Sequence, residues 1–404
     1  MNDVKHPILK DEDLCTGCGA CIAICPQKAI CKQPAGFGAW IPKIDESKCV
    51  GCHICSNVCS HYHYYDNFNK KAYIAYNKDS EMRKLSASGG VFSALASYIL
   101  NCGGVVFGAE MKFSNGQAVV EHSMVTDSRD LLKILGSKYV QSDCKNAYVL
   151  VKKALIEGKK VLFSGCSCQI DGLKRYLKKI DQKNLYTIDL ICHGVPGIDL
   201  FNSYISFLNK KYKGKVVDFS FREKTAGGIK YQINVKIEKN TSVKIIKIPY
   251  IHSGYYRLFM GEEGYREACY HCEYASLKKP ADLTIGDYFE AIRDYPDLFN
   301  GDDAINTETG ISCVLSHTEK GEQLLHLANM CLFTKEVDPL VVQASHGNLC
   351  RPSSHTKLRI NLLAKYNAHG YKAIERYYRI KNLIVTVPKT IIDPIRKRIH
   401  KQKK

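Results

Sequence analysis

A chain of 404 residues, 45% hydrophobic and 24% charged, has an ordinary globular composition and is long enough for two or three domains. No run approaches the roughly 18 apolar residues of a membrane-spanning helix. The N-terminus, MNDVKHPILKDEDLC, lacks the apolar core of a signal peptide, so we expect a cytoplasmic protein. The formal charge of +18 is typical of nucleic-acid-binding proteins, but it counts every cysteine as neutral.

The chain contains 19 cysteines, and nine of them precede residue 60. Disulfides at high density belong to small secreted domains, whereas a large chain without an export signal more often uses cysteines as metal ligands or in redox chemistry. The odd total also argues against complete pairing. The cysteines therefore indicate metal binding.

Residues 11–60 contain two four-cysteine runs of identical spacing, Cys-x2-Cys-x2-Cys-x3-Cys, followed by Pro26 in the first and Ser60 in the second. In paired runs of this kind, three closely spaced thiolates bind one 4Fe–4S cluster and the distant fourth cysteine binds the other. The runs predict two 4Fe–4S clusters, one bound by Cys15, Cys18, Cys21 and Cys59, the other by Cys49, Cys52, Cys55 and Cys25.

Glycines between these cysteines (Gly17, Gly19 and Gly51) allow the backbone to wrap closely round the clusters. Zinc or a structural knuckle is the alternative, but zinc sites typically have two Cys-x2-Cys pairs separated by a longer spacer. Cys31 lies outside the pattern and is expected to be a small packed side chain.

After a polar and aromatic bridge at residues 61–83, the pattern changes to alternating helix and strand signals. A helix is expected over 91–100 and a strand over 105–107. Strands over 160–164 and 185–191 flank a helix over 170–179, an order that favours a right-handed unit with parallel strands. Residues 215–248 alternate instead and predict antiparallel strands.

Several motifs of this region occur in the order found in one known family. They are SASGGVFSALASYIL (86–100), GGVVFGAE (103–110), LGSKYVQSD (135–143), VLFSGCSCQIDGLKRYL (161–177), LICHGVPG (190–197) and ACYHCEYASLKKPADLTIGDYF (268–289). They resemble the coenzyme F420 hydrogenase/dehydrogenase beta-subunit family, many members of which also carry a ferredoxin module. The chain departs from the family at Cys166-Ser167, where members commonly have Thr-Pro.

The resemblance implies a flavoprotein containing FAD or FMN and an additional 4Fe–4S cluster. Its fold class is α+β or α/β multidomain, a bacterial two-cluster ferredoxin-type domain followed by a mixed α/β flavin-binding body that is expected to have its own core. The expected domains are a ferredoxin-type domain (1–62), a linker (63–85), the N-terminal and C-terminal parts of the family domain (86–165 and 166–350, the second with the third cluster), and a basic helical tail (351–404).

The third cluster is predicted at Cys168, Cys192, Cys269 and Cys272. If the strands at 160–164 and 185–191 are parallel neighbours, Cys168 and Cys192 emerge at the same sheet edge. The pair at 269 and 272 precedes a strand at 282–286 that could return to this edge, and the resemblance points to the same four positions. Cys166 is the rival of Cys168. A redox disulfide, a four-cysteine zinc site and separate packing remain alternatives.

Ser86-Ala-Ser-Gly-Gly before a helix is a plausible cradle for a flavin phosphate, with Ser86, Ser88, Gly89 and Gly90 as the contacting residues. An ordinary helix N-cap is the alternative. Ser137 and Lys138 could contact the cofactor, although a solvated lysine is as common. The catalytic residues are unknown, with Lys138 and His193 as candidates, and His193 could equally be structural. Arg222 could bind an acidic substrate or simply belong to a basic strand face.

Three 4Fe–4S clusters at about −2 each and a flavin diphosphate would reduce the net charge to about +10. Much of the remainder lies between Arg376 and Lys404. Such a tail is usually solvated, although it could meet an acidic partner or, peripherally, an anionic membrane. We expect no nucleic-acid partner.

These observations predict an iron–sulfur flavoprotein oxidoreductase that passes electrons between the clusters and a flavin, which exchanges hydride with a small organic substrate. The substrate is coenzyme F420-like or unassigned, and ferredoxin or another redox protein is the expected partner. One alternative is a non-catalytic subunit that relays electrons to a partner enzyme. The other is an iron–sulfur scaffold or sensor without flavin.

Overall fold

The computed structural model describes residues 11–60, 71–225, 228–240, 242–300, 305, 307 and 309–386. Residues 61–70 of the expected bridge and 387–404 of the expected basic tail lie outside this description. Within the described ranges, no helix has both the length and the apolar character needed to cross a membrane.

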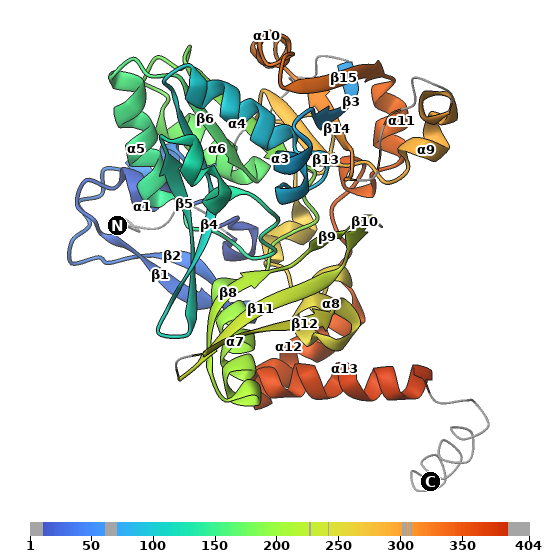
Figure 1. The fold of residues 1–404 in the computed structure, drawn as a ribbon. Helices are drawn as coiled ribbons and strands as arrows, with labels where there is room; N and C mark the ends of the chain where they lie inside the picture. Colours follow the sequence, from blue (N-terminus) through green and yellow to red (C-terminus); the bar gives the residue numbers. More distant parts are fainter. Residues whose placement is uncertain are drawn as a thin grey trace, which may run out of the picture.

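The N-terminal module is a small cysteine-rich unit built round a two-stranded antiparallel sheet. Its elements are η1 (Glu12–Leu14), α1 (Ala20–Ile24), β1 (Ile30–Ala35), η2 (Gly36–Gly38), β2 (Ala39–Ile44) and α2 (Ile54–Asn57). At the hairpin turn, Phe37 is buried among residues of the body that include Leu200 and Phe201. The module therefore packs against the body along one side (Figure 1).

An eight-stranded mixed sheet forms the centre of the body, in the order β15-β3-β14-β13-β7-β6-β4-β5. The strands are β3 (Lys71–Asn77), β4 (Val105–Ser114), β5 (Gln117–Val125), β6 (Val161–Gly165), β7 (Leu185–Leu190), β13 (Leu283–Asp287), β14 (Ser312–Ser316) and β15 (Leu332–Val337). β4, β6, β7 and β13 are parallel neighbours, and the outer strands pair antiparallel. The predicted parallel strand–helix–strand unit is confirmed.

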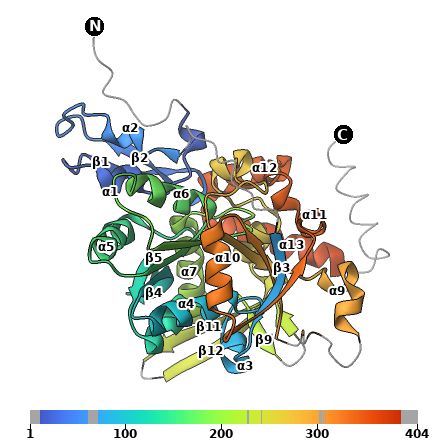
Figure 2. The same cartoon turned by 90° about the horizontal axis from the view of Figure 1, so that it is seen from above.

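Helices cover both faces and the ends of this sheet (Figures 1 and 2). They are α3 (Ser80–Leu85), α4 (Val91–Asn101), η4 (Ser128–Ile134), α5 (Lys145–Ile156), α6 (Ser167–Tyr176), α9 (Ala291–Asp294), η7 (Pro296–Phe299), α10 (Glu319–Leu327), α11 (Pro339–Ala344) and η8 (Gly347–Leu349). In α4, the apolar residues Val91, Leu95 and Ile99 recur at helical spacing and are fully buried against the sheet.

A second layer of the body contains the three-stranded antiparallel sheet β12-β11-β8, as the alternation at 215–248 predicted. Its strands are β8 (Lys215–Ser220), β11 (Gln232–Lys239) and β12 (Ser242–Pro249), and a short hairpin, β9 (Glu223–Thr225) with β10 (Gly228–Lys230), adjoins it. Helices of the same layer are α7 (Ile198–Tyr212), α8 (Gly254–Met260), α12 (Lys357–His369) and α13 (Tyr371–Thr386), and α13 runs along the lower side of the layer in Figure 1. Two short turns complete the layer, η5 (Tyr250–His252) and η6 (Glu267–His271).

Two expectations about domain limits need adjustment. The segment expected as a linker contains β3 and α3, and β3 lies inside the large sheet between β15 and β14. The body also does not have a core entirely of its own, because Ala20 and Val58 of the module are buried in the same apolar cluster as Tyr148 and Leu173. Module and body therefore share part of one core.

Candidate functional site

The eight cysteines of the module line two separate small cavities. Cys15, Cys18, Cys21 and Cys59 line one of about 20 Å³, which we call the inner cysteine group. Cys25, Cys49, Cys52 and Cys55 line one of about 30 Å³, the outer cysteine group. Each cavity combines three cysteines of one run with the last cysteine of the other, which is the arrangement that crossed cluster ligation requires.

The glycines near these thiols have the backbone freedom that the tight wrapping needs. Gly17, Gly19 and Gly51 all adopt left-handed φ angles of +67°, +83° and +69°. Cys31 lies outside both groups and, contrary to expectation, is exposed, with its thiol 3.5 Å from the carbonyl oxygen of Lys43.

The inner thiols are chemically unusual because they are buried together. Burial and the neighbouring thiols raise the pKa of Cys18 to about 12, and the same causes raise that of Cys21 further. Free thiolates would be strongly disfavoured here, whereas a cationic iron–sulfur core would stabilise all four. The donor set therefore fits a 4Fe–4S cluster.

The third cysteine group, predicted at Cys168, Cys192, Cys269 and Cys272, comes together at the carboxyl edge of the parallel strands. Cys168 is in the first turn of α6, Cys192 follows β7, and Cys269 lies in η6 with Cys272 directly after it. Burial raises the pKa of Cys168, and the charges of Cys192, Cys272 and Cys269 raise it further, which is consistent with the predicted group.

Cys166 belongs to the same neighbourhood. Its sulfur, at the N-cap of α6, lies 3.8 Å from the sulfur of Cys192, and their hydrogen bond lowers the pKa of Cys192 to about 7. Cys166, Cys168 and Cys192 line the same cavity, and the choice of Cys168 over Cys166 as a cluster ligand stays a prediction.

A large cavity of about 550 Å³ adjoins the third cysteine group, which is within the size range of cofactor pockets. Cys166, Cys168 and Cys192 form part of its wall. The predicted flavin and catalytic residues that also line it are Ser86, Ser88, Gly90, Ser137, Lys138 and His193. Gly89 does not, because a Cβ on this residue would lie 2.6 Å from the carbonyl oxygen of Ala75 in β3.

The serine hydroxyls of the 86–90 loop are used within the protein. Ser86 donates to the carbonyl oxygen of Met82 at 2.7 Å, and Ser88 donates to that of Ile311 at 2.8 Å. Among the described residues, no side chain caps the N-terminus of α4, whose first residues, Val91 and Phe92, line the cavity. The donors available to an anion are therefore the first backbone N–H groups of α4, strengthened by the helix dipole.

Two basic residues of the cavity wall differ in their electrostatic state. Lys138 donates to the carbonyl oxygen of Leu135 at 2.5 Å, and burial lowers its pKa to about 8. Arg222 forms an ion pair with Asp287 at 2.7 Å, so its charge is already compensated. His193 is 57% exposed, with its Nδ1 3.9 Å from Glu262. Lys138 is the cavity cation best suited to an anionic group.

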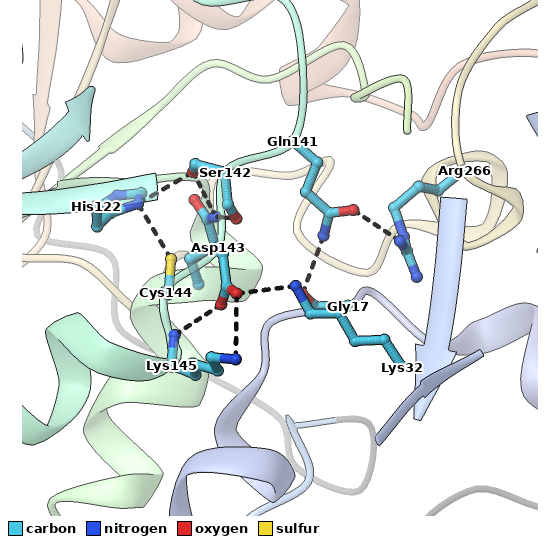
Figure 3. A network of polar contacts seen from close by, with 10 residues as sticks. Gly17, Lys32, His122, Gln141, Ser142, Asp143, Cys144, Lys145 and Arg266 are labelled. Atoms are coloured by element: carbon cyan, nitrogen blue, oxygen red, sulfur yellow. Dashed lines mark hydrogen bonds and ion pairs between the residues drawn. The ribbon is translucent and has the colours of Figure 1, made fainter. Parts of the chain in front are cut away.

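Three residues of the site, His122, Gln141 and Arg266, were not among the residues predicted from the sequence. His122, on β5, lines the cavity and lies between the carbonyl oxygen of Ser164 (2.8 Å) and the hydroxyl of Ser142 (3.0 Å), and burial lowers its pKa to about 4. Gln141 and Arg266 connect this region to the module (Figure 3). His122 and Arg266 lie outside the segments that carry the family resemblance, so no pattern indicated them. Gln141 lies inside one of these segments, 135–143, which was the available signal for it.

Helix α6 connects the inner and third cysteine groups, because it contacts the first and carries one member of the second. A Cβ on Gly172 of α6 would lie 2.9 Å from the sulfur of Cys18, and Cys168 is one helical turn earlier. The charge of Cys18 also contributes to the raised pKa of Cys168. The cysteine groups thus follow one another from the module to the wall of the large cavity.

Comparison with known families gives three matches. Residues 72–148 match the N-terminal part, and residues 158–339 the C-terminal part, of the beta subunit described as coenzyme F420 hydrogenase/dehydrogenase. Residues 14–62 match a 4Fe-4S dicluster domain. No curated protein matches the chain. Among solved structures, a chain of the xenon-derivatised F420-reducing NiFe hydrogenase complex from Methanosarcina barkeri is 18% identical, with a TM-score of 0.43 over 76% of this chain and 96% of that chain.

Proposed function

This chain belongs to the coenzyme F420 hydrogenase/dehydrogenase beta-subunit family, and we propose that it is an iron–sulfur flavoprotein oxidoreductase. Its activity would be to pass electrons between ferredoxin-type 4Fe–4S clusters and a flavin that exchanges hydride with an organic substrate, either coenzyme F420 or a related small molecule. The observation that carries this proposal is the shared wall, in which Cys166, Cys168 and Cys192 border the same 550 Å³ cavity as Lys138 and α4.

Bound clusters supply one-electron steps, and a bound flavin joins these to two-electron chemistry. The outer, inner and third cysteine groups would hold the clusters in this order, with the third group at the cavity. The N–H groups at the start of α4 and the ammonium of Lys138 would bind the phosphate and stabilise negative charge. The apolar part of the wall, which includes Ile134, Leu135 and Phe259, would exclude water from the ring system.

The outer cysteine group is the natural entry point for electrons from a redox-protein partner. Cys52 is exposed, and beside it the side chain of Val50 is 65% exposed. An exposed apolar rim at a cluster suits a weak, transient contact, which is the kind that electron-transfer proteins form.

The test is anaerobic purification of the full chain followed by iron, sulfide and flavin analysis. We expect about twelve iron atoms and about one flavin per chain, and oxidation of the reduced protein by coenzyme F420 or by another hydride acceptor. A protein with flavin that reacts with organic acceptors only after a partner is added would favour an electron-relay subunit. Full iron content without flavin would contradict the proposed activity.

A further inference from the structure

Arg266 occupies the junction between the module and the body. It precedes Cys269 of the third cysteine group by three residues, and only 3% of its surface is exposed. Its backbone N–H donates to the carbonyl oxygen of Val195 at 3.0 Å, and its own carbonyl accepts from the N–H of Cys269 at 3.1 Å. The backbone of Arg266 is therefore part of the loop that presents a third-group thiol.

The side chain of Arg266 leaves this loop and reaches into the module (Figure 3). Its guanidinium donates to the carbonyl oxygens of Trp40 at 2.5 Å and of Cys15 at 3.1 Å, and to the side-chain oxygen of Gln141 at 2.6 Å. Gln141 in turn donates to the carbonyl oxygens of Thr16 and Gly17 at 3.1 and 3.0 Å. Two polar side chains of the body thus hydrogen-bond to the backbone of the segment that carries Cys15.

The fit is tight at Gly17. A Cβ there would lie 2.6 Å from the amide nitrogen of Gln141 and 2.7 Å from the guanidinium carbon of Arg266. This glycine therefore allows the two side chains to approach the peptide groups next to Cys15, as well as adopting a left-handed backbone.

The positive charge of Arg266 is not compensated by these partners, because an amide oxygen and two peptide carbonyls carry no net charge. The guanidinium donates to the carbonyl oxygen of Cys15 itself. Burial raises the pKa of the Cys15 thiol, and the charge of Arg266 acts in the opposite direction. The charge also acts on Cys269. One buried cation thus lies between the loop of Cys269, through its backbone, and the segment of Cys15, through its side chain.

We propose that Arg266 is a positioning residue for electron transfer, which fixes the module against the body and stabilises the reduced form of the cluster held by the inner cysteine group. This inference rests on the proposed function, because it requires 4Fe–4S clusters in the module. A reduced cluster carries one more negative charge than an oxidised one, so a buried cation beside it raises the reduction potential. The outer group lacks this contact and is affected less.

The experiment is a redox titration of the anaerobically purified full chain, monitored by electron paramagnetic resonance. The variants are Arg266→Gln, Arg266→Lys and, as a matched control, Lys32→Gln. Lys32 also bridges module and body, but its charge is paired with Asp143 at 2.8 Å, whereas Arg266 donates to the carbonyl oxygen of the cluster ligand Cys15. The Cys18→Ser variant identifies which signal belongs to the inner cluster.

We expect Arg266→Gln to shift the midpoint potential of the inner cluster to more negative values and to leave the outer cluster unchanged. Arg266→Lys should give a smaller shift in the same direction, because the ammonium retains the charge but not the fork of donors. Lys32→Gln should change neither potential.

The inference would be overturned if the inner cluster of iron-replete Arg266→Gln kept its midpoint potential. Equal shifts in the midpoint potentials of the inner and outer clusters would also overturn it. If Arg266→Gln does not retain its inner cluster, Arg266→Lys decides. An inner cluster retained with an unchanged or slightly more negative midpoint potential supports the role of the charge, and loss of the cluster or a more positive potential overturns the inference. A wild-type protein without 4Fe–4S signals would end the proposed function as well, whereas unchanged potentials in loaded protein end this inference alone.

Discussion

At the scale of single residues, the protonation state of the buried cysteine thiols depends on whether they bind a metal core. Burial and the neighbouring thiols raise the pKa of Cys18 to about 12 and that of Cys269 to about 12, so the unligated thiols remain protonated at neutral pH. A metal core reverses this preference, because coordination deprotonates a thiol outright. Iron binding is therefore expected to release protons and to stabilise the folded module.

Replacing Cys18 with serine tests the inner group. Since a cube with three thiolates is poorly held, the variant should lose about four iron atoms per chain. The matched control is Cys31→Ser, because Cys31 is exposed and belongs to neither group. Iron and sulfide analysis of both proteins provides the measurement. Equal iron in Cys18→Ser and wild type would rule out the assignment of Cys18.

Lys138 makes the binding of an anionic cofactor depend on pH. Burial lowers its pKa from 10.5 to about 8, so its positive charge is present below this pH and is lost above it. Flavin affinity should therefore fall several-fold between about pH 7 and about pH 9.5. Titration of flavin-free protein by fluorescence quenching measures this fall. Lys138→Arg should bind with little pH dependence, because arginine stays charged, and Lys138→Met should bind weakly throughout. The same pH profile in Lys138→Arg would show that Lys138 is not the origin of the pH dependence.

At the scale of elements, local patterns predicted the unit that carries the third cysteine group. Periodicity located β6, α6 and β7, and the rules for parallel connections placed Cys168 and Cys192 at one edge. β3 was missed, because its partners β14 and β15 lie far along the chain and its sequence follows a polar, aromatic bridge. The contacts of Arg266 and Gln141 could not be predicted either, since they depend on how the module docks.

The packing of the 86–90 loop on the sheet changes the expected role of Gly89. A leucine here would clash with the carbonyl oxygen of Ala75 and with the backbone of Ser312 at 2.8 Å, so Gly89→Leu should destabilise the protein by about 1–3 kcal/mol. Flavin content should fall as a consequence, because the loop that leads into α4 is displaced.

Gly103→Ala is the matched control for this prediction. Gly103 has a φ of +73°, and a methyl group added to it would meet no atom of the described residues within 4 Å. This change therefore adds backbone strain of about 1 kcal/mol without a clash. Thermal unfolding and flavin fluorescence of both variants are the measurements. Full flavin content in a destabilised Gly89→Leu protein would show that the 86–90 loop does not contribute to flavin binding.

At the scale of the whole molecule, the cysteine groups and the cavity form a series that depends on the docking of the module. The inner group contacts α6 at Gly172, and α6 carries Cys168 to the cavity wall. Electron transfer between buried centres requires this fixed geometry. The shared core, the hydrogen bonds of Arg266 to the module and the burial of Phe37 in the body all maintain this geometry.

Removal of residues 1–60 should therefore affect the stability of the body as well as its iron content. Tyr148 and Leu173 of the body share a buried cluster with Ala20 and Val58, and exposing such side chains costs about 1.5–3 kcal/mol each. The truncated chain should melt several degrees below the full chain and bind an apolar dye, while retaining about four iron atoms at the third group. The melting temperature of the full chain with Cys18→Ser, which keeps the module, should fall less. Equal melting temperatures of the truncated and full chains would mean that the module contributes nothing to the stability of the body. The close approach of Cys18 to Gly172 of α6 would then not be maintained in solution.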